Sequence, residues 1–449
     1  MYNIFNLILL IVFSSLIIFG SFTIKIRTSF YIYLSSLFFP FNYLQRYFEI
    51  ENPLLRWFPY IFIILYLTYL LIRIPKPVVK SISHLNKYVK IYSFLIIILS
   101  LFTMIIENNS LMMTLQGLKS IILLAGNFII IKILINNNYI KFTEILKIFL
   151  IFAFVNIFMT ISQIYFLSNK IIYYGTRDLI TGLFNNYFDL VFFQIFCIIV
   201  YIVYWRNQIK LIKLPFFFVI GFLLIPIILS NSRAAWLYII ISIFLLIKYS
   251  RLRFSKKEIS LMVSLGIIVI AGLITFNNIM EGFYTERSND SYAYLFNYDY
   301  IKNYIFTDDV IAREDNTVHM SRGFTVIIAY EEIKKSILNS IIGYGSGTTT
   351  LSQVVDTHSL ASKYNTNDLS RISISRILGD FGFLGISLTV ILLILFYLNK
   401  NNRATVKIIS LRKIFTVLII LSLIYFDPFE SPIMMFIIAF IHSNWKSEN

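Results

Sequence analysis

Runs of apolar residues, many of them long enough to cross a bilayer, recur along most of this chain of 449 residues. A helix needs about 20 such residues to span the hydrocarbon core. Because lipid offers no partners for backbone N–H and C=O groups, each run that enters the bilayer must be helical. Charged residues make up only 14% of the chain, too few to cover a soluble protein of this size. The sequence therefore predicts an all-α polytopic membrane protein.

The predicted spans number 12 or 13, because the second and the last are short enough to be tilted, re-entrant or interfacial. The first run is interpreted as a span rather than a cleaved signal peptide, because many more runs follow it. The predicted spans lie near residues 4–23, 28–43, 57–73, 91–106, 112–135, 146–167, 188–205, 214–231, 234–250, 258–276, 378–398, 411–426 and 432–443.

Basic residues gather in four short segments that alternate correctly to share one side of a membrane. These segments are Arg73–Lys90, Arg206–Lys213, Arg251–Lys257 and Lys400–Lys413. Cytoplasmic loops collect Lys and Arg, so this side is predicted to be the cytoplasm. The same bias explains most of the net charge of +16, and no nucleic-acid partner is expected.

One long external loop divides the chain into three parts. Helices 1–10 occupy residues 1–276, the loop covers 277–375, and the C-terminal spans occupy 376–449. The loop holds twelve of the 23 acidic residues, and connections of this length without a function are uncommon. Its segment Arg322–Leu338 is predicted to be one amphipathic helix. The apolar face of that helix would hold Phe324, Ile327, Ile328, Ile333 and Ile337.

Four arginines lie on the predicted external side, where the charge bias of cytoplasmic loops does not explain them. They are Arg177, Arg233, Arg322 and Arg371. Guanidinium groups that converge on one cavity suit a diphosphate, because arginine matches phosphate oxygens with a bidentate fork. The alternative is that these arginines are interfacial anchors that reach lipid head groups. Arg376, close to Arg371, is interpreted as such an anchor.

Other polar residues offer further candidates. Gly343, Tyr344 and Gly345 form a turn that would let backbone approach a ligand, or an ordinary turn. His358 and Asp368 are candidate general bases in the loop, with solvated loop residues as the alternative. The spacing of the four histidines and the single cysteine predicts no metal site and no cofactor. Within the spans, Asn156, Gln163 and Gln194 are predicted to make interhelical hydrogen bonds, whereas Lys119 and Lys132 need an aqueous side or a snorkelling position.

Three stretches carry a family resemblance. They are RDLITGLFNN at Arg177–Asn186, SNSRAAWL at Ser230–Leu237, and Arg322 followed by Gly343-Tyr344-Gly345 and GDFGFLG at Gly379–Gly385. In this order the chain resembles the O-antigen polymerase and O-antigen ligase family of bacterial envelope glycosyltransferases, over roughly residues 160–400.

The resemblance implies a metal-independent glycosyltransferase of the GT-C type in the bacterial inner (plasma) membrane. Such enzymes transfer a glycan from undecaprenyl diphosphate to an acceptor on the external face. Arg177, Arg233 and Arg322 correspond to arginines thought to hold the diphosphate. The expected partners are the undecaprenyl-diphosphate-linked oligosaccharide and the lipid bilayer, and a chain-length regulator protein is a candidate partner.

One departure from the family pattern separates the two activities. The ligases carry a His-Asn pair about eleven residues before the glycine of the closing pattern, and Arg371 and Ile372 stand there in this chain. The sequence thus favours a polysaccharide polymerase, for O-antigen or capsule repeat units, over an O-antigen ligase. A polysaccharide flippase or other transporter, which usually shows repeat symmetry, and a non-enzymatic scaffold are the remaining alternatives.

Overall fold

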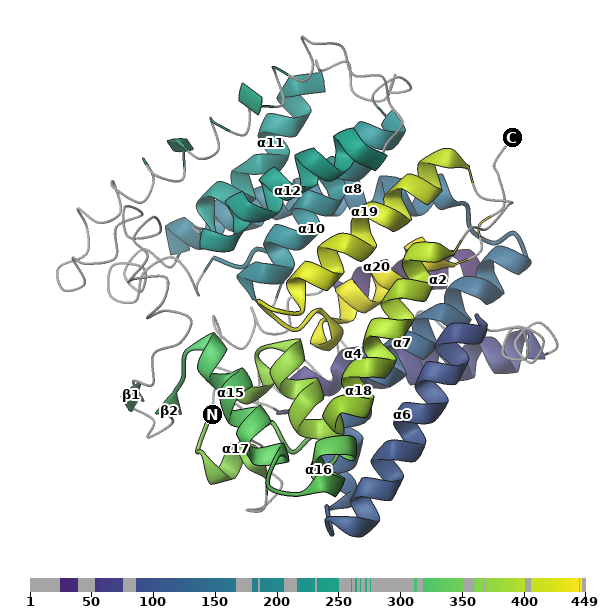
Figure 1. Cartoon of the computed structure of the whole chain (residues 1–449). Helices are drawn as coiled ribbons and strands as arrows, with labels where there is room; N and C mark the ends of the chain where they lie inside the picture. Colours follow the sequence, from purple (N-terminus) through teal and green to yellow (C-terminus); the bar gives the residue numbers. More distant parts are fainter. Residues whose placement is uncertain are drawn as a thin grey trace, which may run out of the picture.

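The computed structural model describes most of the chain. The described residues are 25–38, 53–75, 86–166, 180–184, 186–205, 216–230, 232–249, 311–312, 318–350, 359–366, 368–399, 405–443 and 445, with isolated residues between 260 and 275. Helices dominate them (Figure 1). The only β structure in this part of the chain is a two-residue antiparallel pair, β1 (Ile311–Ala312) and β2 (Val318–His319).

The described helices follow the order of the apolar runs. They are α2 (Ile26–Leu37), α4 (Pro53–Arg73), α6 (Lys87–Ile106), α7 (Leu111–Asn136), α8 (Phe142–Phe166), α10 (Tyr187–Val200) continued by a π-turn at Tyr201–Trp205, α11 (Phe216–Leu229), α12 (Arg233–Tyr249), α15 (Arg322–Ile333), α16 (Ile337–Ile342), α17 (Leu360–Lys363), α18 (Ser373–Leu398), α19 (Val406–Ser422) and α20 (Pro432–His442). Two 3-10 turns, η3 (Asp368–Ser370) and η4 (Pro428–Glu430), complete the described helical elements.

Five described helices are long and apolar enough to cross a membrane, namely α6, α7, α8, α10 with its π-turn, and α18. Four shorter apolar segments belong to α4, α11, α12 and α20. The helical class and the membrane character predicted from the sequence are therefore confirmed. The predicted span at 4–23 lies outside the described residues, as does most of the span at 258–276. The total of 12 or 13 spans, the sidedness and the GT-C type remain predictions.

The last predicted span forms a helix too short to cross a bilayer unaided, whereas the second, near 28–43, is described only as far as residue 38. α20 has 11 residues, so it is about 16 Å long, against a hydrocarbon core of about 30 Å. All its residues are buried, and it packs against α7 and α19. The buried Arg412 of α19 satisfies the carbonyl groups at its C-terminus, donating from Nε to the Ile441 oxygen at 2.8 Å and from Nη2 to the Ser443 oxygen at 2.5 Å. This short helix is held inside the protein.

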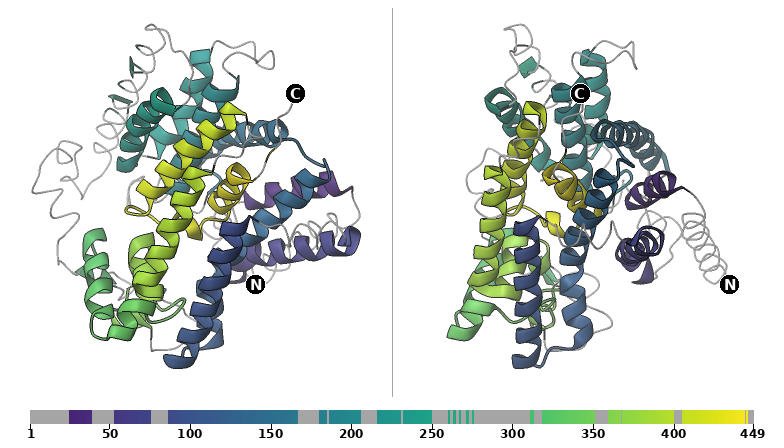
Figure 2. Two further views of the ribbon diagram at one scale, coloured as in Figure 1. Left: turned by 45° about the vertical axis from the view of Figure 1, so that its right-hand side comes forward. Right: turned by 90° about the vertical axis from the view of Figure 1, so that its right-hand side faces the viewer.

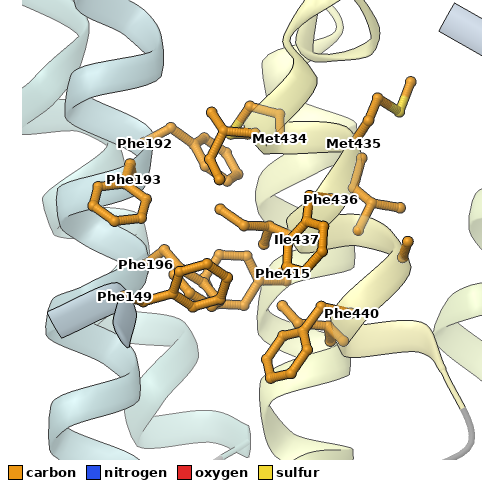
Figure 3. Packing of buried hydrophobic residues seen from close by; sticks show 14 of the residues in the cluster. Phe149, Phe192, Phe193, Phe196, Phe415, Met434, Met435, Phe436, Ile437 and Phe440 are labelled. Carbon is orange, nitrogen blue, oxygen red and sulfur yellow. The ribbon is translucent and has the colours of Figure 1, made fainter. Parts of the chain in front are cut away.

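Aromatic side chains join α20 to its neighbours in the centre of the bundle (Figure 3). Phe196 of α10 meets Phe415 of α19 edge to face, with ring centroids 4.6 Å apart. Phe149 of α8 meets Phe196 at 5.4 Å and Phe440 of α20 at 5.6 Å, both nearly perpendicular. Lipid tails are as apolar as these side chains, so close packing and ring geometry, not escape from water, favour helix association here.

The described part of the long loop packs against the first half of α18, where α15, α16 and α17 gather (Figure 1). α6, α7 and α18 run side by side next to this region (Figure 2). The prediction of a single helix at Arg322–Leu338 is wrong, because the segment forms two helices, α15 and α16, with a break after Ile333. The Ser336 side chain caps the new helix at the Asn339 amide. Of the predicted apolar face, Ile328 and Ile333 are buried, but Ile337 is 84% exposed.

A kink in α18 is where the loop attaches. Gly382 has φ +59°, and a Cβ atom there would lie 2.7 Å from the Gly343 nitrogen and from the Ile341 carbonyl. Gly343 has φ +74° and would place a Cβ atom 2.5 Å from the backbone of Asp380 and Phe381. Both conformations disfavour any side chain, and the two backbones touch.

We expect Gly382→Ala to destabilise the protein by about 1–3 kcal/mol or more, because the new methyl group combines a strained φ with a backbone clash. Thermal unfolding of the purified protein in detergent measures the effect. Gly221→Ala is the matched control, since nothing lies within 4 Å of its Cβ position in α11. Equal melting temperatures for the two variants would show that the kink does not need glycine.

Candidate functional site

The structure places several predicted site residues close to one another at one end of the bundle. Arg322 is the first residue of α15, Asp368 opens η3, and Arg371 follows it. Arg233 is the first residue of α12, although its side chain lies outside what the structure describes. Arg177 and His358 also lie outside the described residues.

The guanidinium of Arg322 rests on aromatic rings from two other parts of the chain. Its central carbon lies 3.6 Å from the ring centroid of Tyr425, which follows α19, and 5.1 Å from that of Phe188 in α10. It also interacts electrostatically with Tyr238 of α12. Such rings attract a cation through their π face and fix its position. Four segments distant in sequence therefore meet around this partly buried charge.

Asp368 and Arg371 support the start of α15. The Asp368 carboxylate is buried and accepts a hydrogen bond from the Met320 amide at 2.8 Å. Arg371 Nη1 lies 3.4 Å from its other oxygen. The Ser321 side chain then caps α15 at the Phe324 amide. These contacts orient the residues on either side of Arg322. A catalytic role for Asp368 and substrate binding by Arg371 remain predictions.

Hydrogen bonds from α8 hold the second half of the motif that begins at Arg177. Gln163 of α8 donates to the Gly182 oxygen at 3.0 Å and accepts from the Thr181 and Gly182 amides at 3.0 and 2.8 Å. Asn156 accepts from the Leu183 amide at 2.8 Å. Asn186 caps α10 at the Asp189 amide, which places Phe188 beside Arg322.

The prediction that polar residues in the spans make interhelical hydrogen bonds is wrong for Gln163 and Asn156, because their partners lie in the turn before α10 and not in a helix. It is confirmed for Gln194 of α10, which donates to the Ala153 oxygen of α8 at 3.2 Å.

One buried and one partly buried ion pair, neither predicted from the sequence, lie next to this site. Arg376 of α18 binds the Asp427 carboxylate, and both side chains are at most 4% exposed. Lys119 of α7 lies 3.1 Å from Glu430 of η4, whose backbone oxygen accepts a hydrogen bond from Tyr60 of α4. These contacts link α4, α7 and α18 to Asp427 and η4, which follow Tyr425 in the chain.

The interpretation of Arg376 as a lipid anchor is wrong, because its guanidinium faces a buried acid. Its partners Asp427 and Glu430 lie in the turn Asp427-Pro428-Phe429-Glu430-Ser431 between two apolar runs. Two acidic residues in so short a connection between apolar runs were the sequence signal that could have predicted buried ion pairs here. Lys119 finds an ion pair in place of the aqueous or snorkelling position expected for it. Lys132, near the other end of α7, lines a small cavity with Asn86 and Ser443.

Two backbone amides of the glycine turn Gly343-Tyr344-Gly345 donate hydrogen bonds to α18. The Tyr344 amide donates to the Gly379 oxygen at 2.9 Å, and the Gly345 amide donates to the Asp380 oxygen at 3.0 Å. The Asp380 carboxylate accepts further hydrogen bonds from the segment that follows, at Gly347, Thr348 and Thr349. The turn thereby attaches the loop to α18. Substrate binding by Gly343, Tyr344 and Gly345 remains a prediction.

Glu332 joins α15 to α17 on the far side of the loop. Its carboxylate accepts hydrogen bonds from Lys335 at 2.5 Å, from Lys363 at 2.7 Å and from the Tyr364 hydroxyl. Burial by itself would raise the pKa of Glu332, but these hydrogen bonds outweigh burial and lower the pKa to about 2.

We expect the folded loop to lose stability in acid through Glu332. Its pKa is lower in the folded than in the unfolded chain, so its contribution is complete above about pH 4.5 and is lost as the pH falls toward 2. The change should be about 1 kcal/mol, because its partner lysines are half exposed and screened. Unfolding midpoints of Glu332→Gln and wild type, compared between pH 6 and pH 3, measure it. Glu331→Gln, on the exposed face of α15, is the control, and an unchanged acid sensitivity in Glu332→Gln would contradict the assignment.

No protein-family model, curated protein or solved structure matches this chain. The resemblance to the polymerase and ligase family therefore rests on the three sequence motifs. In the structure, Phe188, Tyr238 and Arg322 come from those motifs or lie within a few residues of them, and they meet at one site.

Proposed function

We propose that this chain is a polysaccharide polymerase. It would transfer a glycan from undecaprenyl diphosphate to the terminal sugar of another lipid-linked repeat unit on the external face of the membrane. The observation that carries the proposal is the position of Arg322. Its guanidinium lies on Tyr425 and Phe188, within electrostatic range of Tyr238 in the helix that Arg233 begins.

The chemistry of such a transfer suits a fixed cation. The acceptor hydroxyl oxygen forms a bond to the anomeric carbon, and the bond from that carbon to the diphosphate oxygen breaks. The diphosphate leaves with the electron pair, and the hydroxyl proton passes to a base. Negative charge therefore grows on the phosphate oxygens, and a preorganised arginine in a poorly hydrated site stabilises that charge. The rings under Arg322 supply such a setting.

The rest of the site supports the proposal through rigidity. Asp368 and Ser321 hold the start of α15, and Gln163 and Asn156 hold the segment before α10. Asp427, which pairs with Arg376, follows Tyr425 by two residues and so anchors the chain next to that ring. Donors that are fixed before the reaction lose little reorganisation energy in the transition state, which is the condition for electrostatic catalysis.

The test is the length of the glycan made by cells in which the gene is deleted and then restored. The polymerase proposal predicts that deletion leaves a single repeat unit and that restoration returns long chains. Long polymer that accumulates on the lipid carrier without reaching lipid A–core would identify a ligase instead. Lipid-linked repeat units trapped on the cytoplasmic face would identify a transporter. Unchanged glycan in the deletion strain would reject all three activities.

A further inference from the structure

A second polar region lies where α12 ends and α19 begins. α12 passes Arg322 near its start and reaches Tyr249 at its other end. A cavity of about 240 Å³ opens there, lined by Lys248, Tyr249, Val406, Ile409, Ser410 and Lys413. The Ser410 hydroxyl donates to the Tyr249 backbone carbonyl oxygen at 2.7 Å, and this hydrogen bond joins the two helices beside the cavity. The proposed glycan transfer uses none of these residues.

Two positive charges converge on this cavity. Lys248 Nζ lies 5.4 Å from the ring centroid of Tyr249, and Lys413 Nζ lies 5.7 Å from the same ring. Lys413 is also 5.6 Å from the ring of Tyr397, whose hydroxyl hydrogen-bonds that of Tyr249 at 3.0 Å. The lining residues in the described part of the chain include no acid. Two ammonium groups at one ring repel each other, and an anion between them removes that repulsion.

Apolar surfaces lead to the cavity along two helices. On α12, side chains at helical spacing are 45–61% exposed and end beside Lys248; they are Leu237, Ile240, Phe244 and Ile247. On α18, a similar stripe is 47–58% exposed and ends beside Tyr397; it is Ile391, Ile394 and Leu398. A ligand with acyl chains would cover these stripes and bring its charged end to the lysines.

We propose that this cavity binds the phosphate of an anionic phospholipid, with the acyl chains along α12 and α18. The ammonium groups of Lys248 and Lys413 would contact the phosphate oxygens. Because the hydroxyls of Tyr249 and Tyr397 hydrogen-bond each other, one of them would be available as a donor to the phosphate. Basic pockets between spanning helices recognise such head groups on the cytoplasmic side. The basic segments that follow α12 and precede α19 in sequence predict that this end faces the cytoplasm.

The experiment is native mass spectrometry of the full chain released from detergent containing equal amounts of phosphatidylglycerol and phosphatidylcholine. We expect the wild type to retain phosphatidylglycerol preferentially. We expect Lys248→Gln/Lys413→Gln to weaken its binding by about thirty-fold, since each lysine near the surface contributes roughly five-fold. Tyr397→Phe tests the cavity without removing a charge and should weaken binding less.

The control variant is Lys141→Gln/Lys147→Gln, which removes the same charge from exposed positions just before α8 and in its second turn. Thermal unfolding without added lipid verifies that all variants are folded. Equal loss of phosphatidylglycerol in the control and test variants would overturn the proposal, because it would indicate general charge attraction. Full displacement of the lipid by inorganic phosphate at equal concentration would also overturn it, because the site would then bind free phosphate and not a lipid.

Discussion

Replacing Arg322 with alanine is expected to lower the rate of glycan transfer by about 10²–10³, the loss typical of removing one preorganised donor to a developing oxyanion. The guanidinium lies 3.6 Å from the ring of Tyr425, so its position is set before substrate binds. In cells the variant should make glycan of one repeat unit. In a reconstituted reaction it should lower kcat more than it raises KM, because the charge on the leaving diphosphate grows mainly in the transition state.

Two further variants make the Arg322 result specific. Arg322→Lys keeps the charge but loses the planar fork, so partial activity is expected. Lys334→Ala removes an exposed charge at the end of α15 and should retain normal chain length. Membrane levels of all three variants must match the wild type. Long polymer from Arg322→Ala at normal membrane levels would show that this arginine is an interfacial anchor and would refute the proposed mechanism.

Breaking the Arg376–Asp427 pair is expected to have the largest effect on stability. Arg376→Met leaves the Asp427 carboxylate buried without its counter-charge, and such a change destabilises proteins by about 3–5 kcal/mol. The double variant Arg376→Met/Asp427→Asn should recover most of the loss, because it removes both charges. Asparagine also retains an oxygen for the hydrogen bonds that Asp427 accepts from Ser373 and the Phe429 amide. Unfolding in detergent measures both variants.

The matched control for this prediction is Arg27→Met, which breaks an exposed ion pair. Arg27 Nη2 lies 2.6 Å from Glu144, and the Arg27 side chain is 54% exposed, so solvent screens the pair. Its loss should change the stability by less than about 1 kcal/mol. If Arg376→Met and Arg27→Met destabilise the protein equally, burial of the Arg376–Asp427 pair contributes nothing, and the pair is not a structural support of the site.

Much of the helix pattern could be predicted from the sequence. The predicted spans at 91–106 and 432–443 correspond to α6 at Lys87–Ile106 and α20 at Pro432–His442. Polar capping residues, such as Asn86 before α6 and Ser431 before α20, mark where those helices start. The sequence also singled out Arg322, Asp368 and Arg371, which the structure brings to neighbouring positions at the start of α15.

Other features depended on segments that are far apart in the chain. The close approach of Gly343, directly after α16, to Gly382 at the α18 kink could not be predicted from the local sequence, although the capping residue Ser336 marks where α16 starts. Arg376 pairs with Asp427, 51 positions away, and Lys119 pairs with Glu430 across most of the chain. The sequence does not show which helix ends lie next to each other. An arginine near the start of a span therefore cannot be distinguished from a lipid anchor until its partner is known.

The sequence by itself therefore determined that the chain forms apolar helices, and where most of them begin and end. These properties depend on the length of each apolar run and on the polar residues at its ends, because backbone groups in lipid must pair within the helix. Only the tertiary structure decided which charges are paired, which rings support Arg322, and that Lys248 and Lys413 share a cavity. Those outcomes depend on which faces of distant helices pack together, and apolar side chains of similar character do not specify that choice locally.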